Sequence, residues 1–302
     1  MKHKPSLLYP FFAIALWAGN VIVSRMSAHM IGPQAITFYR LLLAVLLMAP
    51  FIAPSAWRDR AVLWAHLGQF AILGFLAMCL FQSLSYLAAE TTTATNMAVF
   101  TALIPLLTVG LAALLLGEPP TIGMVGGGIL SLAGLIWLVS AGQPATLAQG
   151  GVHPGDLLML VAAIVYALYG VLVRRWALPV TAWQSTFMQA LCALAIMFPA
   201  FLATPTPMRV LDAQTIPLIA YAGGLASVVL PFLWLRGIHI LGPGRCAAFM
   251  NLLPVLTALG AIMLLSEPVR SYHVIGGGLA LLGVACAEVI RRPLRRAGES
   301  VA

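Results

Sequence analysis

Residues 100–134 read FTALIPLLTVGLAALLLGEPPTIGMVGGGILSLAG, and residues 249–283 read FMNLLPVLTALGAIMLLSEPVRSYHVIGGGLALLG. Placed one above the other without a gap, at an offset of 149 residues (249 − 100), the two stretches match at a proline, a Glu-Pro pair and a Gly-Gly pair. A shared bias toward Leu, Ala and Gly explains some of the other matches, but it does not put these punctuating residues in register. The chain therefore contains an internal repeat, which divides it into residues 1–150 and residues 151–302.

The composition of the chain identifies the solvent around it. Of the 302 residues, 62% are hydrophobic and only 8% are charged, whereas roughly a quarter of the residues of a soluble globular protein are charged. Most of such a surface cannot face water, so the surrounding solvent must be lipid. The net charge of +8 does not indicate nucleic-acid binding, because the basic residues lie near the ends of apolar stretches, as in membrane proteins.

Ten apolar stretches are each close to the roughly 20 residues that a helix needs to cross the hydrocarbon core. They lie near residues 7–28, 34–53, 66–88, 94–116, 122–140, 156–173, 183–203, 215–238, 244–265 and 272–290. Breaks rich in Pro and Gly separate them, and no gap is long enough for a soluble domain. The first stretch is too long for the core of a signal peptide, so it is expected to be the first membrane helix. The sequence thus predicts an all-α membrane protein with ten transmembrane helices.

The basic residues also orient these helices. With the N-terminus in the cytoplasm, most Lys and Arg residues fall on the cytoplasmic side, and only Arg25, Arg209 and Arg270 fall outside. The positive-inside rule therefore places both termini in the cytoplasm. Each repeat has five helices, an odd number, so the second repeat must insert upside down relative to the first. Inverted repeats of this kind recur in secondary transporters, which bind the substrate near the midplane between the repeats.

The paired Pro…Glu-Pro…Gly-Gly segments, together with the small-residue-rich first helix of each half, resemble the drug/metabolite transporter superfamily and specifically its EamA-type ten-helix members. The aromatic residues of these first helices make the chain similar to bacterial aromatic amino-acid exporters. This resemblance implies export of a small metabolite, with helices 1–4 and 6–9 around a central cavity and helices 5 and 10 at the periphery. Amino acids with aromatic or large apolar side chains lead as substrates, and drugs, purines or other small metabolites are the alternative. The expected location is the cell inner membrane, and no cofactor is expected.

The first helix of each half offers aromatic and polar side chains far from the interfaces. Trp17 and Asn20 are three residues apart and share one helix face, and the repeat offset relates them to Tyr166 and Tyr169. Aromatic rings with polar tips suit an amphipathic solute, because the faces contact its apolar part and the tips form hydrogen bonds. The alternative is that the rings only fill the core of the helix bundle. Asn20 argues for the cavity, because a polar group within the membrane is costly unless it has a task.

Other polar or aromatic residues within the predicted helices complete the candidate substrate-binding set. They are Tyr39, Gln82, Tyr86, Asn96, Phe100, Trp234 and Asn251. Any one of them alone is explained by interhelical hydrogen bonding, which contributes roughly 0.6–2 kcal/mol in membranes. As a set, they exceed what a packing interface needs.

Two further features concern gating and charge. Pro105 and Pro254 occupy matched positions within predicted helices, where a missing backbone donor produces a kink that serves either a gate or static packing. Arg40 lies several residues inside the second predicted helix. Its guanidinium either attracts a substrate carboxylate or reaches toward the outer interface.

Motifs for other functions are missing from the sequence. There is no HExxH, GxSxG or Walker loop, and the four cysteines form no CxxC pair, so no catalytic residue or metal ligand is nominated and an enzyme is not expected. A channel is disfavoured by the inverted repeat. The glycine runs 126–128 and 276–278 allow close helix contact, either within a monomer or at the seam of a homodimer. The expected partners are a small-molecule substrate and the lipid bilayer.

Overall fold

The computed structural model describes residues 7–27, 30–89, 91–92, 97, 100–145, 154–253, 255–256 and 270–294. Within these ranges the chain is helical, and the strand content is limited to one isolated bridge between Thr121 and Pro293. Six helices in the described part are long and apolar enough to cross a membrane: Pro33–Arg58, Leu67–Ser85, Ile122–Val139, Pro154–Trp176, Ala182–Ala203 and Thr215–Leu241. The predicted class, an all-helical multi-pass membrane protein, is confirmed. The count of ten spans and the inversion of the repeats stay predictions.

The helices pack into two compact units that cut across the two halves of the sequence. Unit 1 comprises Met1–Tyr86 and Trp176–Ile240, and unit 2 comprises Leu87–Arg175 and Leu241–Ala302. Each unit therefore takes helices from both repeats. The division at residue 150 describes the repeat and stays a prediction, whereas these units describe packing.

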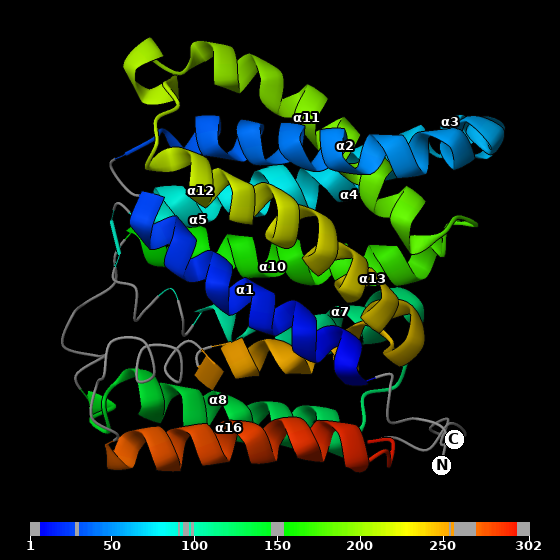
Figure 1. Cartoon of the computed structure of the whole chain (residues 1–302). Helices are drawn as coiled ribbons and strands as arrows, with labels where there is room; N and C mark the ends of the chain where they lie inside the picture. Colours follow the sequence, from blue (N-terminus) through cyan, green and yellow to red (C-terminus); the bar gives the residue numbers. More distant parts are fainter. Residues whose placement is uncertain are drawn as a thin grey trace. The chain divides into compact units, whose positions relative to one another are not determined.

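Unit 1 contains the helices of Figure 1 that precede residue 90 and those between α11 and α13. They are α1 (Leu8–Ser27), α2 (Pro33–Arg58), α3 (Arg60–Ala65), α4 (Leu67–Gly74), the π-helix η2 (Phe75–Leu80), α5 (Phe81–Ala89), α11 (Ala182–Ala203), the 3-10 helix η3 (Thr206–Arg209), α12 (Thr215–Ala220), the π-helix η4 (Tyr221–Val229) and α13 (Leu230–Leu241).

Local sequence explains where several of these helices begin. Pro33 occupies the first turn of α2, and Thr181 and Gln184 form a capping box at the start of α11. Before α12, the backbone N–H of Thr215 donates to the carboxylate of Asp212 at 2.7 Å and lowers the pKa of that carboxyl.

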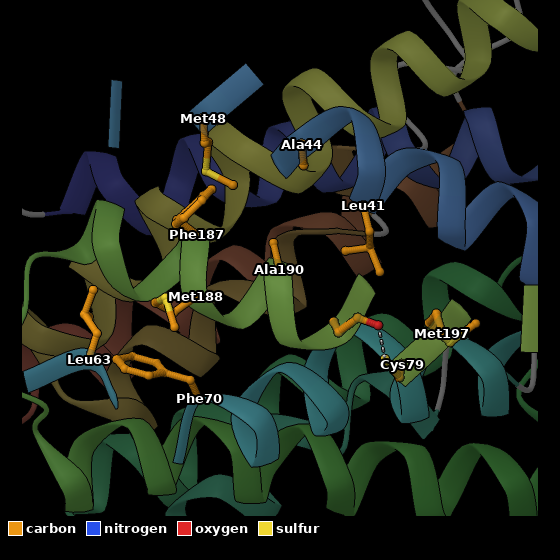
Figure 2. Close-up of a cluster of buried hydrophobic side chains, with 11 residues drawn as sticks. Leu41, Ala44, Met48, Leu63, Phe70, Cys79, Phe187, Met188, Ala190 and Met197 are labelled. Atoms are coloured by element: carbon orange, nitrogen blue, oxygen red, sulfur yellow. Dashed lines mark hydrogen bonds between the residues drawn. The ribbon is translucent and has the colours of Figure 1, made fainter. Parts of the chain in front are cut away.

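The core of unit 1 lies between α2 and α11, which run side by side, and α3, α4 and η2 complete it (Figures 1 and 2). The buried side chains of this core include Leu41, Ala44, Met48, Leu63, Phe70, Phe187, Met188, Ala190, Ala193 and Met197. Cys79 belongs to the same core, and its thiol donates to the carbonyl oxygen of Ala193 at 3.6 Å. The core is therefore apolar and closely packed, as expected for side chains that hold helices together.

Two helix crossings in unit 1 are related by the repeat. A Cβ atom at Gly74 would overlap the backbone of Gln189, and one at Gly223 would lie 3.0 Å from the carbonyl oxygen of Arg40. The offset relates the two glycines (74 + 149 = 223) and the two facing residues (40 + 149 = 189). Glycine at both positions lets one helix approach the backbone of the other.

The π-helical segments of unit 1 follow the same relation. η2 spans Phe75–Leu80, and the offset carries this range to residues 224–229, which lie inside η4. Each π segment begins next to one of the crossing glycines or contains it. π-helical turns are rare and occur frequently at functional sites.

Unit 2 contains α7 (Ile104–Leu116), α8 (Ile122–Val139), α10 (Pro154–Trp176), α14 (Pro243–Ala248), the 3-10 helix η5 (Phe249–Leu252) and α16 (Ser271–Val289). α8 and α16 lie side by side and form the most extensive helix pair (Figure 1). Gly127 faces Gly283 and Gly134 faces Gly276, so the two helices run antiparallel. In the middle of the pair, Ser131 donates from Oγ to the carbonyl oxygen of its repeat equivalent, Ala280, at 3.2 Å. These glycine faces are thus covered within the chain itself.

Pro105 lies in the first turn of α7, which begins at Ile104. Residues 102 and 103 form a turn between α7 and the helical residues Phe100 and Thr101, and the backbone N–H of Leu103 donates to the carbonyl of Phe100 at 3.1 Å. The position of Pro105 suits proline, because the first turn of a helix needs no backbone donor there. The predicted role of Pro105 in a kink or gate stays a prediction. The matched residue, Pro254, lies outside the described residues.

Candidate functional site

Three aromatic rings from three helices of unit 1 meet at α1. The ring of Trp17 stands edge-to-face with Phe81 of α5 at 6.1 Å between centroids, and with Trp234 of α13 at 6.2 Å. The interplanar angles are 90° and 81°. All three side chains are buried, and their contacts bring together two residues that the sequence nominated, Trp17 and Trp234. This group is called the α1 aromatic cluster below.

Asn20 lies one turn beyond Trp17 on α1. Its side chain is 6% exposed, and no hydrogen-bond donor among the described residues reaches its Oδ1. A nearby contact fixes α1 on the π-helix η4: the hydroxyl of Tyr221 donates to the carbonyl oxygen of Leu16 at 3.1 Å. Gly19 makes this contact possible, because a Cβ atom there would overlap the Tyr221 phenol.

A buried cation lies on the other flank of η4. Arg40 of α2 is 7% exposed, and its Nε donates to Oγ of Ser227 at 2.8 Å. The Ser227 hydroxyl in turn donates to the carbonyl oxygen of Ala222, five residues earlier, at 2.7 Å. Arg40 is therefore buried and hydrogen-bonded to η4, and the two possibilities that the sequence left open, a substrate carboxylate and the outer interface, stay predictions. Ser227, the residue that orients the Arg40 side chain, belongs to the π-helix η4.

Unit 2 holds a second group of nominated residues. Tyr166 and Tyr169 of α10 are buried with ring centroids 5.5 Å apart, and Cys246 of α14 is buried as well. Asn251 of η5 is 1% exposed, and its Oδ1 has no donor within the described part of the chain. Phe100 is half-buried.

The remaining nominated residues are used differently or fall outside the described residues. The hydroxyl of Tyr39 donates to the carbonyl of Arg209 at 2.9 Å, and its ring packs on Phe201 at 5.2 Å, so Tyr39 joins α2 to α11 and η3. Gln82 is half-buried next to Phe81 of the α1 aromatic cluster. Tyr86 belongs to α5, but its side chain lies outside the described residues, as does Asn96 altogether.

The nominated set did not include Phe81, which packs against Trp17, Tyr221, which donates to Leu16, Ser227, which accepts from Arg40, or the buried Cys246. Phe81 and Cys246 carry no signal in an apolar helix, where phenylalanine and cysteine are ordinary core residues. Tyr221 and Ser227 are polar residues within a predicted span. Such residues are expected to have a polar partner, but the sequence does not identify it.

Unit 2 also contains a surface hollow. Its volume is about 100 Å³, and it is lined by residues that include Glu118, Pro119, Met124 and Arg245. Glu118 also forms an ion pair with Arg174 at 3.5 Å, with both side chains 44% exposed. Pockets that enclose small molecules are typically about 300–1,000 Å³, so this hollow is too small for a metabolite. No group of three or more potential metal ligands occurs among the described residues.

Comparison with known proteins identifies the family. The model of the EamA-like transporter family matches residues 4–140 and, a second time, residues 153–288. The chain belongs to the EamA-like transporter family. The resemblance inferred from the Pro…Glu-Pro…Gly-Gly segments is thereby confirmed, and the protein is a multi-pass membrane protein of a transporter family.

Several known proteins are similar to the chain over most of its length. The chain is 30% identical to the uncharacterized transporter YyaM of Bacillus subtilis, over 83% of the chain and 81% of that protein. It is 28% identical to an uncharacterized transporter of Archaeoglobus fulgidus, over 94% and 97%. It is 25% identical to a probable terminal-alkyne amino-acid exporter of Streptantibioticus cattleyicolor, over 99% and 98%. One solved crystal structure shares the fold with a TM-score of 0.76 at 19% identity, covering 95% of this chain and 99% of the other.

Proposed function

We propose that this EamA-family protein is a secondary transporter that exports small metabolites, foremost amino acids with aromatic or large apolar side chains, across the inner membrane. The observation that carries the proposal is the double match of the family model, once in each half of the chain. The relative from Streptantibioticus cattleyicolor, a probable amino-acid exporter, supports the substrate class.

The proposed mechanism is alternating access through a central cavity between two inverted repeats of five helices, with both termini in the cytoplasm. Three findings support this inversion. The family model matches both halves. The equivalent helices α8 and α16 run antiparallel through reciprocal glycine contacts. The repeat offset also relates the two glycine crossings of unit 1, Gly74 against Gln189 and Gly223 against Arg40.

The proposed substrate contacts come from the chemistry of the buried residues. The α1 aromatic cluster offers apolar contact area, and Asn20 offers a buried hydrogen-bonding group on the same helix. Tyr166 and Tyr169 offer phenols at the repeat-equivalent positions of α10. Within unit 1, the rings and the amide suit a solute with one apolar and one polar part.

A transport panel in proteoliposomes tests the proposal. We expect uptake of aromatic amino acids by the wild-type protein, and a decrease of about tenfold or more for Trp17→Ala and Asn20→Ala, which corresponds to about 1.4 kcal/mol or more of lost binding. Trp57→Ala is the matched control, because Trp57 is exposed on α2 and contacts no nominated residue in the described structure. Unchanged transport of every active solute by both variants would remove α1 from the site.

Reporter fusions at the two ends of the chain test the topology separately. Ten spans place the reporters at residues 1 and 302 on the same, cytoplasmic face. Reporters on opposite faces would rule out two five-helix repeats in inverted orientation.

A further inference from the structure

Oδ1 of the buried Asn20 side chain has no hydrogen-bond donor in the part of the chain that the structure describes. This oxygen is a buried acceptor on α1. A buried acceptor without a donor costs free energy, because the group gives up its hydrogen bonds to water and receives none in exchange. The contact from Tyr221 to Leu16 holds this part of α1 in place, so Asn20 does not escape the cost by a shift of its helix.

The neighbours of Asn20 point to the charge of the missing donor. Trp17 lies one turn away on the same helix and stands perpendicular to both Phe81 and Trp234. Aromatic faces attract cations through their quadrupoles, Trp most strongly, and several rings at steep angles are the usual surroundings of a bound ammonium group. The Asn20 amide oxygen, one helical turn along α1 from Trp17, is the kind of hydrogen-bond acceptor that an ammonium also needs.

The carboxylates of unit 1 are engaged elsewhere. The ranges of unit 1 contain two acidic residues, Asp59 and Asp212. Oδ2 of Asp59 accepts from Nε2 of Gln184 at 2.7 Å, and Asp212 accepts from the backbone N–H of Thr215. A cation that binds beside α1 therefore relies on aromatic faces and the Asn20 amide oxygen, and not on a carboxylate of this unit.

We propose that Asn20 and the α1 aromatic cluster together bind the ammonium group of the exported solute. Oδ1 of Asn20 accepts one ammonium N–H, and the rings around Trp17 stabilise the positive charge. The inference rests on the proposed export function and sharpens it: the substrate carries a protonated amine, and this site selects for the amine and not for the carboxylate.

Three ring-matched compounds separate the two ends of an amino acid: phenylalanine, phenethylamine, which lacks the carboxylate, and 3-phenylpropionate, which lacks the amine. Binding to the purified full-length protein is measured by the ligand-induced shift of its thermal unfolding, independently of transport. We expect the two amines to bind and 3-phenylpropionate not to bind. Asn20→Leu, which keeps the approximate volume and removes the acceptor, should raise the dissociation constant of both amines about tenfold or more.

One further variant tests the role of the Asn20 acceptor, and a second serves as a control. Asn20→Asp keeps the shape and strengthens the acceptor, so it should lower the dissociation constant of phenethylamine relative to the wild type. Thr186→Val is the matched control, because Thr186 is a fully buried polar residue of unit 1 whose Oγ1 also lacks a partner among the described residues, and it should bind all three compounds as the wild type does.

The outcomes distinguish this inference from the export proposal. Equal binding of 3-phenylpropionate and phenylalanine, or unchanged amine binding by both Asn20 variants, overturns the ammonium site and leaves the export proposal standing. If none of the three compounds binds the wild type, the proposed substrate class is wrong, and the ammonium site is wrong with it.

Discussion

At the scale of the residue, Arg40 is the charge whose placement the sequence left open. A guanidinium within a membrane span is costly, and it persists where hydrogen bonds from the protein compensate for lost water. Ser227 provides one such bond from the π-helix η4, across 187 positions of the chain. The two residues join α2 to η4 at the crossing where Gly223 contacts the Arg40 backbone.

We expect Ser227→Ala to destabilise the protein by about 1–3 kcal/mol, because the charged Nε of Arg40 then loses a buried acceptor. Thermal unfolding in detergent measures the effect. Ser85→Ala is the control. Ser85 donates to the carbonyl of Phe81 within its own helix, so removal of this hydroxyl should destabilise the protein by well under half as much as Ser227→Ala. Equal destabilisation by the two variants would show that the bond to Arg40 contributes nothing special.

At the scale of the element, hydropathy and the repeat located the helices, but not their internal geometry. The stretch predicted at residues 66–88 is continuous as a span, yet it divides into α4, the π-helix η2 and α5. A π-helical turn differs from an α-helical one by one residue per turn and leaves no mark in composition, so apolar periodicity does not reveal it. Pro105 shows the same limit, because the residue type fixes a missing donor but not whether the helix bends or begins there.

The glycine crossings give the element-scale prediction. Gly74→Ala should destabilise unit 1 by about 1–3 kcal/mol, because the added Cβ meets the backbone of Gln189, which cannot rotate away as a side chain does. Gly68→Ala on the same helix is the matched control, since a Cβ there has open space. Unfolding of both variants in detergent provides the comparison. A Gly74→Ala protein as stable as Gly68→Ala would mean that the close crossing does not occur.

At the scale of the whole molecule, the repeat was visible in the sequence and the packing was not. Matched prolines and glycines reveal equivalent helices, but they do not say which helices touch. Trp17 meets Trp234 and Arg40 meets Ser227, and neither pair consists of repeat equivalents. The candidate residues Trp17, Asn20 and Trp234 were found because polar and aromatic groups within a span are uncommon, whereas their arrangement depends on side-chain fit between distant segments.

Cysteine cross-linking tests the antiparallel relation of α8 and α16. In the structure, the backbone N–H of Leu294 donates to the carbonyl of Pro120 at 2.9 Å, so the start of α8 lies beside the end of α16. In a protein with its four native cysteines replaced, we expect Pro120→Cys and Leu294→Cys to form a disulfide under mild oxidation. Pro120→Cys with Arg270→Cys is the control, because Arg270 precedes the other end of α16. Cross-linking of the control pair in preference would mean that the two helices run parallel.

The interleaving of the two units has a consequence for biosynthesis. While a ribosome delivers the first half to the bilayer, α2 and α4 have already entered lipid, yet α11, the helix that buries their shared face, is encoded more than a hundred residues later. The same delay separates α8 from α16. A truncated polypeptide ending near residue 150 would present unfilled glycine grooves to the membrane, and two separately translated fragments would have to find each other before either became compact. Maturation of this transporter is thus a late event that begins only when the second repeat arrives.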